Sequence, residues 1–405
     1  MHRFLLILFT AISVTAYSQE DLPHMLLLDD KVQVEATDAV NDMYNFKFTK
    51  AENQFQVLKV KYPQHPLPYF LMGLSTWWKM YPNLEIREKT EKYDDTFVAY
   101  MDTAIEYAEK LYDTNEKNYE AIFFLAGAYG FKAHLYGERK KYGKATFAAR
   151  HALSYLRKNV ENEELSPEFL FGDALYNYYA EWIKENYPLL RPILIFFKSG
   201  DKELGIKQLK QVSYNAFYTR TEAQYYLMRI YRDEDMNEKA LTIARYLATT
   251  FPDNGYFERM YGQLCYMTGQ SREAETVCLD IIKKLELGMP GYEEISGRYA
   301  GFILGYYYQY RDNNLQKAKI YYQKAIKYTE QIGQVEQNYY LFSLANLARI
   351  ADKEGDKQTA KQYYKTLLKH TDKKGDQEEL HDEAKTYLKT NKRIKQSKEL
   401  PKESA

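Results

Sequence analysis

The amino-acid sequence predicts an all-α chain folded as an α-solenoid, a right-handed superhelix of about six to eight helix hairpins. The first observation is a repeat. Ala240 and Ala274 stand thirty-four residues apart, and each is followed by apolar or small residues four and seven positions later. The second is composition, because 45% of the residues are hydrophobic while only 11 are proline and 19 are glycine. The third is the lack of long alternating apolar runs, so we expect no strands.

Two adjacent units share this frame in register, one from about Thr221 to Asn254 and one from about Gly255 to Gly288. Further units keep similar residues at longer spacing. They are marked by Leu304, Gly305, Tyr308, Ala318, Tyr322 and Ala325, then by Leu347, Gly355, Ala360, Tyr364 and Leu367, and near the N-terminus by Ala51, Phe55, Leu58 and Pro63. The first unit resembles the tetratricopeptide consensus at Leu227, Tyr231, Ala240 and Pro252. This resemblance implies antiparallel helix pairs that stack side by side and bind other molecules.

The chain divides into four predicted parts: a signal peptide over 1–18, divergent tetratricopeptide-like repeats over 19–220, regular repeats over 221–384, and a basic, disordered tail over 385–405. In the divergent part the helices expected over 95–112 and 118–135 are longer than the consensus. Gly127 and Gly130 fall inside the second of them, so we interpret them as helix-packing residues rather than as a phosphate-binding loop.

The segment 174–209 carries a narrower resemblance. Its Pro188 and Pro192, its Gly200-Asp201 turn and its Gly205-Ile-Lys-Gln-Leu helix resemble a signature of the eukaryotic tetratricopeptide repeat protein 39 family. The simpler interpretation is that the two prolines break a helix and that Gly205 is a helix-contact residue. Either way the segment supports the fold and implies no activity.

The first residues predict export. Met1-His2-Arg3 is a short basic start, Phe4 to Thr15 is an apolar run, and Ala16-Tyr17-Ser18 is a small-x-small cleavage site. No cysteine follows, so we do not expect a lipoprotein. The signal peptide and the tyrosine-rich helical repeats resemble exported proteins of Bacteroidota, and this resemblance implies a periplasmic location. We expect no integral membrane span, because no later segment reaches eighteen apolar residues.

No catalytic or cofactor-binding pattern is present. The seven histidines show no metal-ligand spacing, and no Walker A loop, GxGxxG or G-x-S-x-G occurs. Lysine plus arginine and aspartate plus glutamate both total 56, so we expect no nucleic-acid partner. Cys265 and Cys278 are out of register on their predicted helices, which favours two buried free thiols over a disulfide. We therefore expect no enzyme and no cofactor.

The 41 tyrosines indicate a binding surface. Many occur in pairs, such as Tyr339-Tyr340, and adjacent helical residues point about 100° apart, so one ring of each pair can enter the core while the other faces outward. The tetratricopeptide resemblance implies which positions of the first helices line the concave groove. The groove residues predicted in this way are Tyr225, Arg229, Arg232, Tyr256, Arg259, Tyr266, Tyr299, Phe302, Tyr306 and Arg349.

Two functions fit this pattern. An aromatic groove with arginines suits a protein or peptide partner, which makes the chain a non-enzymatic periplasmic scaffold. The alternative is a glycan- or small-ligand-binding protein of an uptake system, because sugars also stack on aromatic rings.

Overall fold

The computed structural model describes residues 25–158, 166–186 and 199–399. Within these ranges the chain forms helices and no strand, as the sequence predicts. The predicted signal peptide and the two prolines at 188 and 192 lie outside the described residues. The N-terminal helices are α1 (Asp30–Tyr44), α2 (Phe48–Lys61), α3 (Pro66–Met80), α4 (Arg87–Thr90), α5 (Asp94–Thr114), α6 (Tyr119–Glu138), α7 (Tyr142–Leu156), α8 (Pro167–Asn186) and α10 (Lys202–Asn215), with short 3₁₀ turns η1 (Leu26–Leu28), η2 (Tyr81–Asn83) and η3 (Glu91–Tyr93).

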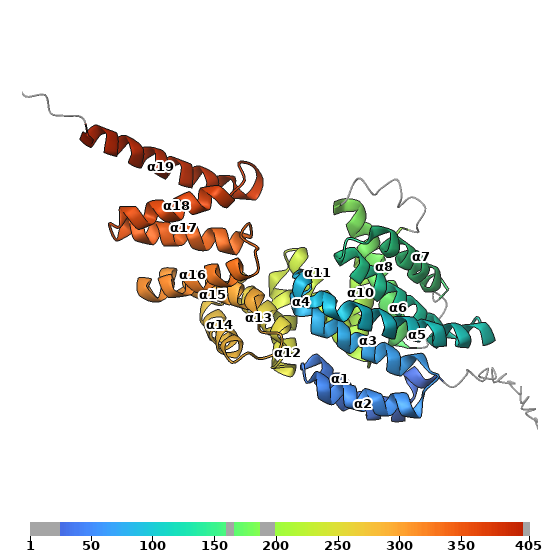
Figure 1. The fold of residues 1–405 in the computed structure, drawn as a ribbon. Helices are drawn as coiled ribbons and strands as arrows, with labels where there is room; N and C mark the ends of the chain where they lie inside the picture. The colour runs from blue at the N-terminus through green and yellow to red at the C-terminus, as the bar shows by residue number, and fades with distance from the viewer. Residues whose placement is uncertain (1–24, 159–165, 187–198, 400–405) are drawn as a thin grey trace, which may run out of the picture.

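The C-terminal helices continue the same pattern. They are α11 (Arg220–Asp233), α12 (Asn237–Thr250), α13 (Gly255–Met267), α14 (Ser271–Glu286), α15 (Glu294–Tyr310), α16 (Leu315–Gln331), α17 (Asn338–Lys353), α18 (Lys357–His370), the 3₁₀ turn η5 (Gly375–Gln377) and α19 (Glu378–Glu399). Each helix packs mainly on its neighbours in the sequence. In the described ranges this gives eight hairpins, from α1 and α2 to α17 and α18, with α19 closing the array (Figure 1).

Small residues set the close packing of the C-terminal hairpins. Ala240, Ala274, Ala318 and Ala360 are all buried, which confirms the predicted frame. The turns between paired helices also follow the pattern, because Gly269 and Gly355 have φ values of +77° and +85°, the left-handed conformation that ends a helix. The first helices of successive hairpins also touch one another, α13 with α15 and α15 with α17, and so form the inner layer of this half.

The N-terminal helices are longer, as expected. α5, α6 and α8 have 21, 20 and 20 residues, against 14 in both α11 and α12. The buried residues of α7 are Ala148 and Ala152.

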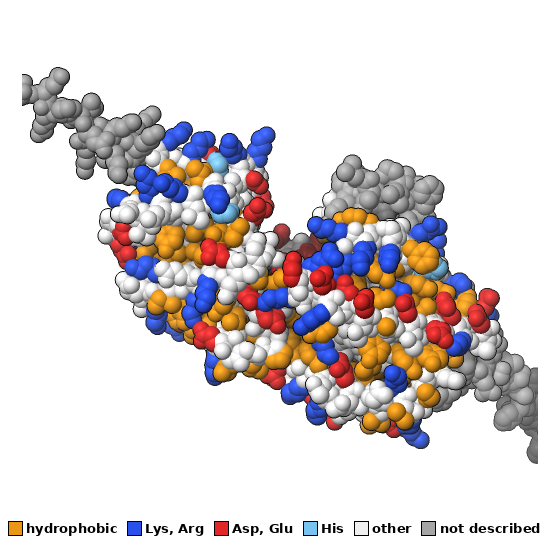
Figure 2. Space-filling view, in the orientation of Figure 1, with side chains coloured by type: hydrophobic (Ala, Val, Ile, Leu, Met, Phe, Trp, Pro, Cys, Tyr) orange, Lys and Arg blue, Asp and Glu red, His pale blue; other side chains and the backbone are white. Residues whose placement is uncertain are grey.

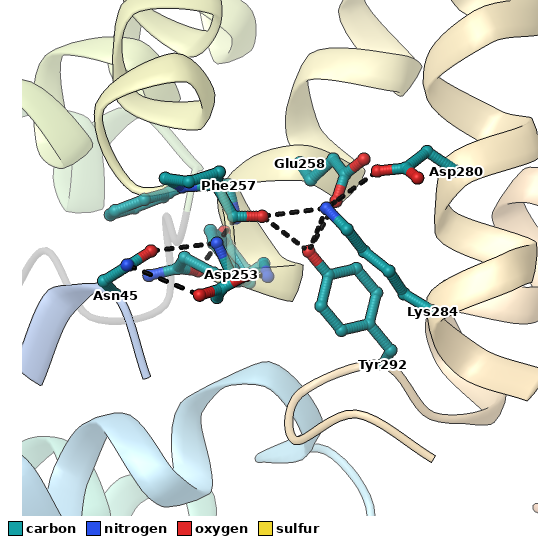
Figure 3. Close-up of polar contacts among 10 residues, drawn as sticks. Asn45, Asp253, Phe257, Glu258, Asp280, Lys284 and Tyr292 are labelled. Carbon is teal, nitrogen blue, oxygen red and sulfur yellow. Dashed lines mark hydrogen bonds and ion pairs between the residues drawn. The ribbon is translucent and has the colours of Figure 1, made fainter. Parts of the chain in front are cut away.

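The N-terminal hairpin also contacts the middle of the chain, which the repeat pattern does not predict. Asn254 Nδ2 donates a hydrogen bond to the carbonyl oxygen of Tyr44 over 2.7 Å, and the backbone N–H of Asp253 donates to Asn45 Oδ1 over 2.9 Å (Figure 3). On the far side of this turn Lys284 Nζ lies 2.8 Å from Glu258 Oε2. The first hairpin of the solenoid is therefore in contact with the turn between α12 and α13, about two hundred residues later in the sequence.

The predicted disordered tail needs correction. α19 runs to Glu399, so residues 385–399 are helical. The first part of α19 packs on the array, because Leu380 and Ala384 are buried and Tyr387 Oη donates to Asp352 Oδ1 over 2.5 Å. Both cysteines are free and buried, as predicted.

Candidate binding site

The structure separates the ten predicted groove residues into two groups. Tyr225, Arg229, Tyr256 and Arg259 lie on α11 and α13 against the segment 81–86. Tyr266, Tyr299, Phe302, Tyr306 and Arg349 lie further along the array, on α13, α15 and α17. Arg232 ends α11 and pairs with its neighbour Asp233.

The first group is covered by the chain itself. Tyr81 Oη and Tyr225 Oη hydrogen-bond to each other, and Arg229 Nη1 donates to Tyr225 Oη over 2.7 Å and to Tyr81 Oη over 3.0 Å. Arg259 is 6% exposed and donates to the carbonyl of Pro82 over 3.1 Å. These side chains are therefore unavailable to a partner, because the turn after α3 fills this part of the inner surface.

Arg298 belongs to the same internal contact, and sequence reasoning missed it. Its side chain is buried, donates to Gln334 Oε1 and lies 3.6 Å from Glu85 Oε1. Lys89 forms a parallel ion pair with Glu294. Only contacts between distant segments distinguish these residues, so no local signal in the sequence identifies them.

The second group forms a continuous aromatic face on the inner layer. We define the aromatic face by Tyr266, Tyr299, Phe302, Tyr306, Tyr310, Tyr339 and Phe342. Its centre is the buried Phe302, whose ring centroid lies 5.9 Å from that of Tyr266 and 4.8 Å from that of Tyr339. Tyr310 and Phe342 are 47% and 37% exposed. The rings thus bridge three hairpins and remain open to solvent at one edge.

Tyr339 joins this face through a paired tyrosine. Its neighbour Tyr340 is 1% exposed and donates to Glu330 over 3.2 Å, while the Tyr339 ring packs on Tyr299. The pair therefore divides between core and surface, as the helical geometry of doubled tyrosines predicts.

The aromatic face carries no charged side chain of its own, and the two guanidinium groups that stack on the Tyr299 ring, Arg298 at 4.9 Å and Arg259 at 5.9 Å from its centroid, are buried. Burial raises the pKa of Tyr266 to about 12 and also raises the pKa of Tyr339. Arg349, at the edge of the face, already pairs with Glu383 and donates to Asn346 Oδ1 over 3.2 Å. A ligand on this face would consequently meet ring surfaces and phenol groups rather than an unpaired charge.

No group of three or more histidine, cysteine, aspartate or glutamate side chains suited to a metal ion occurs among the described residues. Within the same residues no helix is long and apolar enough to cross a bilayer.

Comparisons with known proteins give no family. No family model and no curated protein matches the chain. Among solved structures, the human IFIT1 dimer with PPP-AAAA is 14% identical, with 80% of this chain and 68% of that chain covered and a TM-score of 0.42. The P58(IPK) TPR domain is 17% identical, with 89% and 99% covered and a TM-score of 0.24. Yeast Tom70 is 12% identical, with 91% and 97% covered and a TM-score of 0.30. At these TM-scores none of the three structures carries an argument about this chain. Its description as an all-α solenoid rests on its own helix pairs.

Proposed function

We propose that this protein is a non-enzymatic scaffold that binds an extended peptide segment of a partner protein on the aromatic face. The observation that supports the proposal is the run of partly exposed rings across α13, α15 and α17. Aromatic side chains supply large contact area with little conformational entropy to lose, and they dominate the energetics of peptide and protein interfaces.

The phenol groups make a peptide a suitable ligand. Tyr299 and Tyr306 make no hydrogen bond to another described residue, so each can donate one to a peptide carbonyl. The paired state of Arg349 argues against a ligand that depends on its charge, since such a ligand would have to displace Glu383.

A peptide selection tests this proposal. Peptides selected from a random display library against the whole protein are titrated by calorimetry against wild type, Tyr306→Ala and Phe342→Ala. We expect each variant to weaken binding by about 1 to 3 kcal/mol, as for aromatic anchors in an interface. The matched control is Tyr246→Ala, an exposed tyrosine on the outer helix α12, which should bind as wild type does.

Two outcomes contradict the proposal. Full affinity in both variants places the peptide elsewhere. Equal weakening in the Tyr246→Ala control shows nonspecific adhesion to exposed rings. If no peptide is selected but an oligosaccharide array binds in a Tyr306-dependent way, the glycan-binding alternative replaces the peptide scaffold.

We also propose that the protein is exported to the periplasm after removal of residues 1–18. The support is the sequence pattern of those residues. The intact mass of protein from a periplasmic fraction should correspond to a chain that begins at or near Gln19, and a mass that retains Met1 to Ser18 contradicts the cleavage.

A further inference from the structure

A ligand-sized cavity lies in the N-terminal half, between α3, α6, α7, α8 and α11. Its volume is about 630 Å³, within the range of small-molecule sites. The walls are almost entirely apolar. They include Leu67, Phe70, Leu74, Ile122, Leu153 and Phe169. The cavity is separate from the aromatic face, with which it shares no residue.

Small residues on the long helices leave this space open. Gly130 on α6 lines the cavity, and a Cβ atom added there would meet no heavy atom within 4 Å. Gly127, one turn earlier, also lines the cavity but packs against the Phe70 ring, where an added Cβ would lie 3.2 Å away. The space is open to solvent at one side, so its apolar walls face water when it is empty, and an apolar ligand that covers them is favoured.

Charge differs between the outer and inner walls of the cavity. Arg150 and Thr146 of α7 line it and are exposed, so they mark its mouth. Arg150 forms no hydrogen bond or ion pair with another described residue. The buried wall carries Glu222, whose carboxylate accepts from Trp78 Nε1 over 2.8 Å. Lys and Arg side chains also gather near the end of the molecule that carries α7 and α8 (Figure 2).

We infer that the cavity binds an amphipathic anion, a single acyl chain that ends in a carboxylate or similar acidic group. The chain fills the apolar interior, and the acidic group stays at the mouth beside Arg150. The opposite orientation would take the acidic group out of water and away from Arg150, into the apolar interior, which is unfavourable.

Binding of a dansyl-labelled undecanoic acid to the whole protein tests this inference. We expect saturable one-to-one binding with a blue-shifted emission, and displacement by dodecanoic acid. Gly130→Leu should reduce affinity at least about tenfold, because the new side chain enters the cavity. The control is Gly137→Leu on the same helix, which also has open space for a Cβ but does not line the cavity and should bind as wild type does.

The acidic group is tested separately. Arg150→Gln should weaken the binding of dodecanoic acid about tenfold, the size of one charge-assisted hydrogen bond, and leave displacement by dodecanol unchanged.

Absence of probe binding by wild type, or wild-type affinity in Gly130→Leu, overturns the site. Equal weakening of acid and alcohol in Arg150→Gln overturns the anionic class. The unfolding transition of Gly130→Leu is measured alongside its binding. Loss of binding supports the site only if this transition is at or above that of wild type. A lowered transition shows that the cavity does not have the open space on which the inference rests.

Discussion

Two glycines in comparable places show how the halves of this molecule differ. Gly301 lies on α15, where an added Cβ would stand 2.9 Å from the backbone nitrogen of Ala325 and 3.0 Å from the carbonyl oxygen of Tyr321. Gly130 lies on α6, where an added Cβ would meet nothing within 4 Å. The same residue type therefore brings two helices into contact at Gly301, as it also does at Gly205 between α8 and α10, and leaves space between helices at Gly130.

The difference teaches that the repeat pattern specifies close packing only where small residues face a partner backbone. In the C-terminal half the helix pairs keep that frame, and the inner layer ends in an aromatic face. In the N-terminal half the longer helices α6 and α8 leave a partly open apolar cavity between them. One architecture thus offers an aromatic surface and an apolar pocket with an open mouth.

The largest expected effect is from Gly301→Leu. The new side chain forces α15 and α16 apart, which should lower the free energy of unfolding by about 3 kcal/mol. Gly130→Leu should leave it unchanged or raise it by up to about 1 kcal/mol, because leucine has the higher helix propensity. Urea unfolding of both variants measures this, and equal losses would remove the contrast between the halves.

A second test uses Glu222, where the cavity meets the contact between halves. Burial raises the pKa of Glu222 to about 7 despite the hydrogen bonds from Trp78 and Tyr44. The folded state then holds a proton that the unfolded state has released, so this group lowers stability progressively as pH rises from about 4.5 to about 7. Relative to wild type, Glu222→Gln should gain up to about 3 kcal/mol between pH 4.5 and pH 8. A difference that stays constant with pH contradicts the raised pKa.

A third test compares two arginines that the sequence places in one groove. Arg259→Ala removes a hydrogen bond to Pro82 across the contact between halves and one to Ser296 of α15, and should cost about 2 kcal/mol. Arg349→Ala breaks an exposed pair with Glu383 and should cost less than about 1 kcal/mol. Thermal melts of the two variants rank them, and the reverse order would show that the turn after α3 does not cover α13.

The smallest effect concerns the thiols. Burial raises the pKa of Cys265 to about 12 and also that of Cys278, so the native protein should react slowly with Ellman's reagent. Unreduced protein should show two thiols after denaturation. A count of zero would mean that the two cysteines form a disulfide.

The sequence predicts the helix pairs well because their determinants are local. Ala240 and Ala274 recur at a fixed spacing, and Gly269 and Gly355 end helices in the conformation that glycine favours. Four of the ten predicted groove residues, Tyr266, Tyr299, Phe302 and Tyr306, also belong to the aromatic face. The contact of Tyr81 and Pro82 with α11 and α13 joins residues more than 140 positions apart. No repeat consensus encodes that contact, so the consensus wrongly predicts that Tyr225 and Arg259 line the groove.

The cavity was missed for a different physical reason. Gly127 and Gly130 are recognisable in the sequence as residues of helix packing, and for Gly127 that is what the structure shows. Whether a small residue meets a partner depends on the angle and separation of the next helices, which arise from the whole array.

Xenon binding tests the central contrast most directly, because xenon enters apolar cavities without needing a specific ligand. In a crystal of the wild-type protein under xenon pressure, the account predicts anomalous density between α6, α7 and α8, its loss in Gly130→Leu, and none between α15 and α16. An empty N-terminal half, or equal occupancy in both halves, would contradict it.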